Sequence, residues 1–187
     1  TIELMGEGRK LADQIQKKLA VVMPGYKIES EVEKLLHYGA DIVYYMSHPL
    51  LSSFSTDGYT SAFVQLIQKK KPEIVLVGAT SIGRDIGPRI AARLGTGLTA
   101  DCTKLEIDAE DGKILQTRPA FGGNLMATIV CPKNRPQMST VRPGVMEKAF
   151  HQETAAGTME TFIPDLSEND IRAKLVEIIK EEKKQVN

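Results

Sequence analysis

The sequence predicts an α/β fold in which helices cover both faces of a mostly parallel sheet, giving three layers. Segments with helical spacing of apolar residues alternate with short apolar runs through the first two-thirds of the chain. The run from Ile74 to Val77 is apolar throughout, as expected for a strand buried on both faces of a parallel sheet. A chain of 187 residues is long enough for one sizeable core and marginal for two, so residues 1–187 are expected to form one domain.

The first elements are identified by apolar residues that recur every three or four positions in helices and cluster in strands. Helices are expected at 5–18, 29–38 and 56–70, and strands at 19–23, 41–46 and 73–77. Gly39 is expected to cap the second helix, and Pro72 ends the third. A helix between two strands implies a right-handed crossover, so these strands are expected to be parallel.

After Gly97 the pattern changes to strands joined by short links, which predicts extra strands beside the parallel core. These strands are expected at 101–107, 114–117, 124–131, 137–141 and 158–163. Asp111-Gly112 is a hairpin signal. A capping-box pattern from Ser167 to Asp170 predicts a last helix that runs to about residue 184.

Composition excludes several functional classes. The 24 basic and 24 acidic residues give a net charge of zero, which argues against wholesale nucleic-acid binding. No apolar run approaches the ~20 residues needed to span a bilayer, and the first residues do not read as a signal peptide. The absence of an initiator Met suggests a processed or truncated start. The two cysteines and three histidines have no metal-ligand spacing, so no metal site is expected.

The turn from Gly78 to Gly87 lies between the buried strand and a helix, where open α/β sheets bind ligands. Glycines and the hydroxyls of Thr80 and Ser81 could form a degenerate nucleotide cradle. However, Arg84 and the residue after it replace the Lys-Ser/Thr pair of a phosphate loop. The alternative is a tight strand-to-helix turn with a capped helix, which the residue types favour.

A second candidate segment is Thr117-Arg-Pro-Ala-Phe-Gly-Gly-Asn124. Arg118 could present its planar guanidinium to a carboxylate, a phosphate or an electron-rich ring. The alternative is a hairpin turn with an exposed arginine. A third segment at residues 134–144 carries Arg-Pro pairs on either side of a short strand, which indicates an edge or interface strand. No acid pair or Ser-His-Asp set points to a catalytic residue.

Together and in order, these segments are far more specific. The run from Val77 to Arg89, Gly97-Leu-Thr-Ala-Asp-Cys-Thr103, the Arg118 segment and Arg135-Pro-Gln-Met-Ser-Thr-Val-Arg-Pro143 resemble the large (alpha) subunit of electron-transfer flavoproteins over nearly the whole chain. The resemblance implies a Rossmann-like sandwich similar to adenine-nucleotide hydrolase domains. It also implies a heterodimer with a homologous small (beta) subunit.

In that family, electrons pass from a dehydrogenase, such as an acyl-CoA dehydrogenase, through FAD. The resemblance therefore implies an electron carrier of the bacterial cytoplasm rather than an enzyme. Two departures stand out: the family's first strand does not precede the first helix, and the carboxy-terminal FAD domain is absent. No cofactor is accordingly expected in this fragment alone, whereas the partner subunit is expected to hold AMP or a second FAD.

The resemblance also assigns site residues. Arg118 is expected to reach the flavin of the small subunit, as it does in electron-bifurcating members of the family. The form of its segment, Thr117 to Asn124, favours such a bifurcating complex. The expected interface residues are Thr117, Pro119, Phe121, Gly122, Gly123, Asn124 and Arg142. Two other readings remain open: a free-standing nucleotide-binding protein that uses the turn from Gly78 to Gly87, and a homo-oligomerising module.

Overall fold

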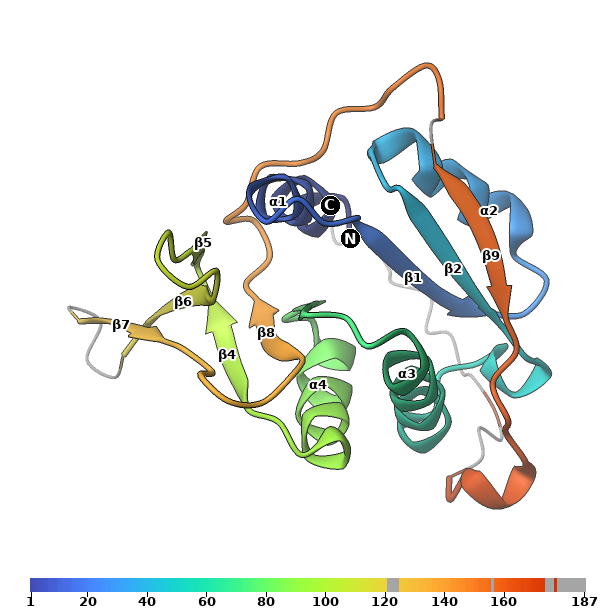
Figure 1. Cartoon of the computed structure of the whole chain (residues 1–187). Helices are drawn as coiled ribbons and strands as arrows, with labels where there is room; N and C mark the ends of the chain where they lie inside the picture. The colour runs from blue at the N-terminus through green and yellow to red at the C-terminus, as the bar shows by residue number, and fades with distance from the viewer. Residues whose placement is uncertain (121–124, 156, 174–176, 178–187) are drawn as a thin grey trace, which may run out of the picture.

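The computed structural model describes residues 1–120, 125–155, 157–173 and 177 (Figure 1). The helices are α1 Ile2–Gln14, α2 Glu29–Glu33, α3 Thr56–Lys70 and α4 Ser81–Leu94, with short 3-10 helices η1 Lys34–Tyr38, η2 Pro49–Leu51 and η3 Glu168–Asp170. The strands are β1 Ala20–Gly25, β2 Ile42–Ser47, β3 Ile74–Gly78, β4 Leu98–Cys102, β5 Lys104–Ile107, β6 Ile114–Pro119, β7 Met126–Ile129, β8 Gln137–Val141 and β9 Thr158–Phe162.

The strands form three sheets of three strands each. The orders are β1-β2-β9 and β3-β8-β4, both entirely parallel, and β5-β6-β7, which is antiparallel. The prediction of an α/β fold with parallel strands and extra strands later in the chain is confirmed. The parallel strands are divided between two sheets because β1 and β3 do not pair with each other within the described residues.

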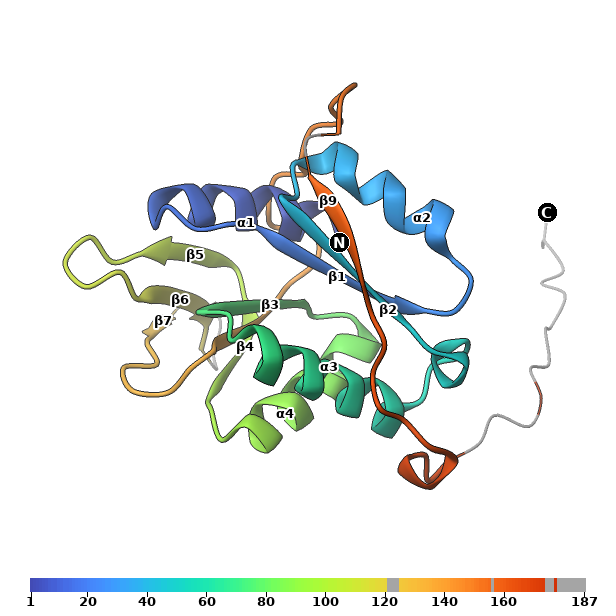
Figure 2. The same ribbon diagram turned by 45° about the vertical axis from the view of Figure 1, so that its right-hand side comes forward.

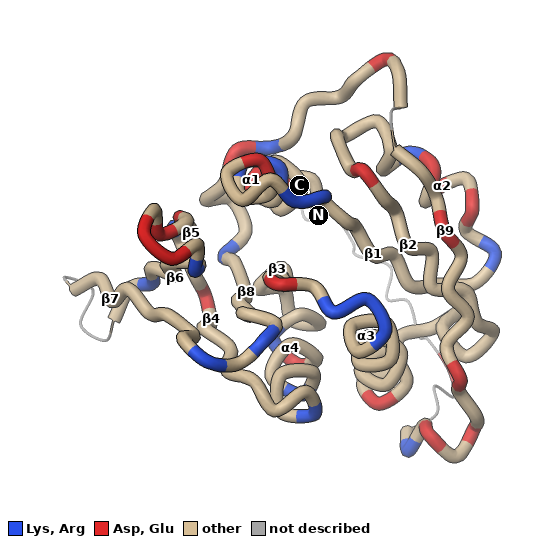
Figure 3. The backbone as a smooth tube through the Cα atoms, in the orientation of Figure 1, with Lys and Arg blue, Asp and Glu red and all other residues tan. Residues whose placement is uncertain are grey.

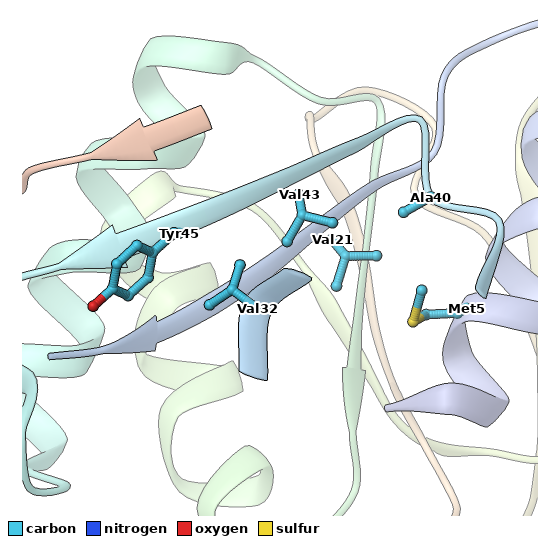
Figure 4. Close-up of a cluster of buried hydrophobic side chains, with 6 residues drawn as sticks. All are labelled: Met5, Val21, Val32, Ala40, Val43 and Tyr45. Atoms are coloured by element: carbon cyan, nitrogen blue, oxygen red, sulfur yellow. The ribbon is translucent and has the colours of Figure 1, made fainter. Parts of the chain in front are cut away.

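Helices cover both faces of the parallel sheets, as the three-layer prediction requires. Figure 2 shows α1 and α2 on one side of the strands and α3 and α4 on the other. In β2, alternate side chains point to opposite faces: Val43 and Tyr45 pack with Met5 and Val32 (Figure 4), whereas Met46 packs against α3. A strand covered on both faces needs apolar residues at successive positions, which explains its sequence.

The sheet β3-β8-β4 has its most buried strand in the centre. Every residue of β8 is buried, while every residue of β3 is only half-buried. The expectation that the apolar run at Ile74 would be fully buried is therefore wrong. The reason is position: β3 is an edge strand of its sheet within the described residues, so one flank lacks a neighbouring strand.

Two further expectations change. The segment expected as one strand at 101–107 is two strands, β4 and β5, which belong to different sheets. The predicted capping box is present, since the Asp170 carboxylate accepts hydrogen bonds from the Ser167 amide and hydroxyl. The helix does not follow over 171–173, because Ile171 adopts an extended backbone and packs near Gly58 of α3. Most of the remaining predicted helix lies outside the described residues.

Candidate functional site around Asp101 and Arg118

The carboxyl ends of β4 and β8 meet the end of β6 that leads to Pro119. The Arg142 amide donates to the Cys102 carbonyl at 2.9 Å, and the Thr103 amide donates to the Thr117 carbonyl at 2.9 Å. These bonds bring Arg118 and Arg142 to the same end of the sheets, although they are far apart in the sequence. Thr117 is buried, with its hydroxyl 2.9 Å from that of Thr128.

Asp101 lies at the centre of this site, and sequence reasoning missed its role. Its backbone is left-handed, with φ of 63°, where β4 shifts register between Thr99 and Cys102. Its amide donates to the Thr140 hydroxyl at 2.9 Å. A non-glycine residue with this backbone in a strand is uncommon, so the bulge aims a carboxylate at the surface at some conformational cost.

Two arginines hold the Asp101 carboxylate. Arg142 donates from Nη2 at 2.5 Å and from Nε at 3.3 Å, and Arg84 donates from Nη2 at 3.0 Å. The hydrogen bond from Arg142 is the main cause that lowers the pKa of Asp101 below its ordinary value. The network fixes two cations at the sheet end and neutralises one of them.

Arg118 stands beside this network without a carboxylate of its own. Its side chain is half-buried, and its Nε donates a hydrogen bond to the Pro119 carbonyl at 3.4 Å, which is long and weak. Its charge reaches Asp101 and Cys102, although burial dominates at Cys102 and raises the pKa of the thiol to about 11. The site therefore presents a guanidinium that forms no ion pair with the part of the chain that the structure describes.

The remaining predicted interface residues have mixed outcomes. Pro119 is half-buried at the end of β6, and Arg142 is exposed and paired with Asp101. Phe121, Gly122, Gly123 and Asn124 lie outside the described residues. The structure thus places Thr117, Arg118, Pro119 and Arg142 together and adds Asp101 and Arg84 to them.

The turn from Gly78 to Gly87 is occupied by contacts within its own chain. The Thr80 hydroxyl accepts from the Gly83 amide at 3.2 Å and caps α4. Arg84 donates from Nε to the Ala79 carbonyl at 2.8 Å. A Cβ atom on Gly83 would lie 1.8 Å from the Gly78 carbonyl oxygen. These contacts support the tight strand-to-helix turn.

The described part of the chain holds neither a candidate metal cluster nor a candidate membrane span. No cluster of three or more His, Cys, Asp or Glu side chains there is arranged to hold a metal ion. None of its helices combines the length and the apolar character needed to cross a membrane.

Comparison with known families decides the assignment. The electron transfer flavoprotein domain family matches residues 1–167. This chain belongs to that family. The family resemblance expected from the sequence is thereby confirmed.

Three curated relatives illustrate this similarity. The electron transfer flavoprotein subunit alpha of Thermoanaerobacterium thermosaccharolyticum is 55% identical over 100% of this chain and 56% of its own length. Protein FixB of Clostridium saccharobutylicum is 50% identical over 98% of this chain and 54% of its own length. The acryloyl-CoA reductase electron transfer subunit beta of Anaerotignum propionicum is 47% identical over 99% of this chain and 57% of its own length. The chain thus spans about half the length of these relatives.

In this electron transfer flavoprotein domain, Asp101→Asn is expected to change the pH dependence of stability. A carboxyl whose folded pKa is lowered stabilises the fold above its unfolded pKa of about 3.9, and this contribution is lost as the pH falls through that value towards the folded pKa. The free energies of unfolding of the wild type and variant should therefore differ most near neutral pH and converge in acid. Urea unfolding across the range from about pH 3 to about pH 7 measures this.

Asparagine is the suitable replacement because it tolerates the left-handed backbone of Asp101. Arg142→Gln removes the arginine partner of Asp101 in the main ion pair. Its free energy of unfolding should likewise approach that of the wild type in acid. Parallel pH profiles for the wild type and both variants would show that the pair does not stabilise the domain.

Proposed function

We propose that this chain is part of a heterodimeric electron-transfer flavoprotein that passes electrons between dehydrogenases and an acceptor through FAD. Within that complex it serves as scaffold and as the interface with the small (beta) subunit. One observation carries the proposal: the chain is 55% identical along its whole length to a protein named as the alpha subunit of such a flavoprotein. A subunit named alpha implies a companion subunit.

The proposed role is that of an electron carrier of the bacterial cytoplasm rather than of an enzyme. FAD in the full complex would be bound mainly by a carboxy-terminal domain, and the partner subunit would hold AMP or a second FAD. The dehydrogenase is expected to act on acyl-CoA esters. The name of the Anaerotignum relative, which links that protein to acryloyl-CoA reductase, supports this choice.

Arg118 is the residue that we propose to face the small-subunit flavin. Its guanidinium is half-buried and forms no ion pair within the described residues, and Arg84 and Arg142 already satisfy the nearby carboxylate of Asp101. The site therefore fits a group that gains negative charge on reduction. In this position Arg118 would stabilise that charge and raise the reduction potential of the flavin.

The Arg118→Gln variant is accordingly expected to lower the potential of the small-subunit flavin by tens of millivolts, on the order of one desolvated charge interaction. Spectroelectrochemical titration of the reconstituted complex measures the potential. Arg89→Gln is the control, because Arg89 is an exposed arginine on α4 that pairs with Asp85. If both variants keep the wild-type potential, Arg118 does not act on the flavin.

The assembly itself is tested by co-expressing this chain with the small subunit from the same source. Size-exclusion chromatography with a visible spectrum then reports both partners and flavin. Co-elution supports the scaffold role. A flavin spectrum in that peak indicates that the small subunit carries its own FAD and favours bifurcation, whereas a colourless peak favours AMP. Separate elution argues against the proposed assembly, and calorimetry with ATP, AMP and FAD then tests nucleotide binding by the chain itself.

A further inference from the structure

The Asp101 carboxylate lies deeper in the protein than the two arginines that bind it. Its side chain is 20% exposed, whereas the side chains of Arg142 and Arg84 are 43% and 57% exposed. The register shift of β4 and the left-handed backbone at Asp101 place the carboxylate there. Strained backbone of this kind persists only where the surrounding structure fixes it, and it is typical of functional sites. The fold therefore keeps a negative charge just below a surface that carries arginines.

Asp101 connects three elements of the fold. It lies in β4, Arg84 comes from the first turn of α4, and Arg142 follows directly after β8. Arg84 donates to Oδ1 of the carboxylate at 3.0 Å, and Arg142 donates to Oδ2 at 2.5 Å. Because hydrogen bonds between charged groups are strong and directional, binding through both oxygens fixes the orientation of both guanidinium groups. Without the carboxylate, each arginine would lose the ion-pair partner that the structure gives it.

Arg118 lies beside this network. β5 and β6 run antiparallel with Lys104 opposite Thr117, and the Thr103 amide donates to the Thr117 carbonyl at 2.9 Å. Arg118 follows Thr117 and so extends β6 towards the end of β4 that holds Asp101. The positive charge of Arg118 accordingly acts on the Asp101 carboxylate. A redox group placed at Arg118 would be influenced by both charges.

Asp101 is an acidic residue in surroundings that are otherwise basic. The sequence contains no Asp or Glu from residue 114 to residue 146, and the first turn of α4 carries no acidic residue. Asp85, in the next turn of α4, is bound by the Thr56 hydroxyl and by Arg89. The acidic residues of the antiparallel sheet gather in the turn between β5 and β6, at the end of β5 that is remote from β4 (Figure 3). Removal of the Asp101 charge would therefore leave the arginines of the site without a counter-charge.

We propose that Asp101 is a positioning residue that lowers the reduction potential of the small-subunit flavin at Arg118. It holds Arg84 and Arg142 in fixed ion pairs and partly neutralises them, so that the unpaired Arg118 is the main cation acting on the flavin. This inference rests on the proposed function and deepens it. Arg118 favours the reduced, negatively charged flavin, whereas Asp101 opposes it, and the balance of the two sets the potential.

Asp101→Asn tests this role, because asparagine tolerates the left-handed backbone but carries no charge. Spectroelectrochemical titration of the reconstituted complex should show a higher potential of the small-subunit flavin. At a fixed electrode potential, the ratio of reduced to oxidised flavin should rise about tenfold, which corresponds to about 30 mV for a two-electron couple. A purely structural role of Asp101 would change the stability of the domain but not this potential.

Asp111→Asn is the matched control. It removes an exposed carboxylate that pairs with Lys113 in the turn between β5 and β6, so the potential should stay at the wild-type value. Arg84→Gln is a second test, which also decides the matter if the Asp101→Asn chain does not assemble. It removes a cation and leaves the carboxylate in place, so the potential should fall.

The outcomes separate this inference from the proposed function. If Asp101→Asn leaves the potential unchanged or lowers it, while Arg118→Gln still lowers it, the role of Asp101 is overturned and that of Arg118 survives. If the Asp101→Asn chain does not assemble, an unchanged potential in Arg84→Gln overturns the inference. If Arg118→Gln also leaves the potential unchanged, or the complex holds no small-subunit flavin, the roles of both residues fail.

Discussion

Gly83→Ala is expected to destabilise the domain by at least about 3 kcal/mol. The added Cβ would lie 1.8 Å from the Gly78 carbonyl oxygen and 3.0 Å from its carbonyl carbon. Both neighbours are backbone atoms of the strand-to-helix turn, so α4 and β3 would have to move apart. Urea unfolding followed by circular dichroism measures the loss of free energy.

Gly97→Ala is the control for this substitution. A Cβ atom there would meet no atom within 4 Å, and Gly97 has no positive φ. Its effect should be within about 0.5 kcal/mol of the wild type. A loss below about 1 kcal/mol for Gly83→Ala would mean that the turn can relax, and the structural explanation for this glycine would be wrong.

Ile90→Ala is expected to cost about 2–5 kcal/mol, as for other large apolar side chains deleted from a core. Ile90 is buried on α4, in a cluster with Met138 of β8, so its removal leaves a cavity between helix and sheet. Thermal and urea unfolding measure the change. Ile82→Ala is a control on the same helix, because Ile82 is exposed and alanine favours helices. Equal losses for the two variants would contradict the packing of α4 on β8.

Local patterns in the sequence predict a helix or strand well where the residues of that element alone determine its structure. The helix expected at 56–70 agrees with α3, since its apolar spacing continues until Lys71 turns left-handed before Pro72. The burial of β3 could not be predicted in the same way. Its apolar sequence indicates a covered strand, but its place at a sheet edge depends on which strands pair, and that is a property of the whole chain.

The candidate site shows the same contrast between residues that local sequence predicts and residues that only the folded chain reveals. Arg118 and Arg142 stand out in the sequence through their Arg-Pro pairs. Asp101 does not, because its importance depends on a bulge in β4 and on two arginines that are 17 and 41 positions away. Its only local signal is an acidic residue within a short apolar strand. Charge networks of this kind become visible only after the strands have been placed next to each other.

The central place of β8 has a consequence for the order in which the chain folds during synthesis. β8 lies between β3 and β4 but follows both in the sequence, and β9 joins β2 across more than a hundred intervening residues. Neither parallel sheet can be completed while the ribosome is still making the first two-thirds of the chain. The apolar strand β3 must therefore wait for its neighbour β8, and β2 can pair only with β1 until β9 is made, which makes folding slow and leaves apolar strand edges of the nascent chain exposed to aggregation.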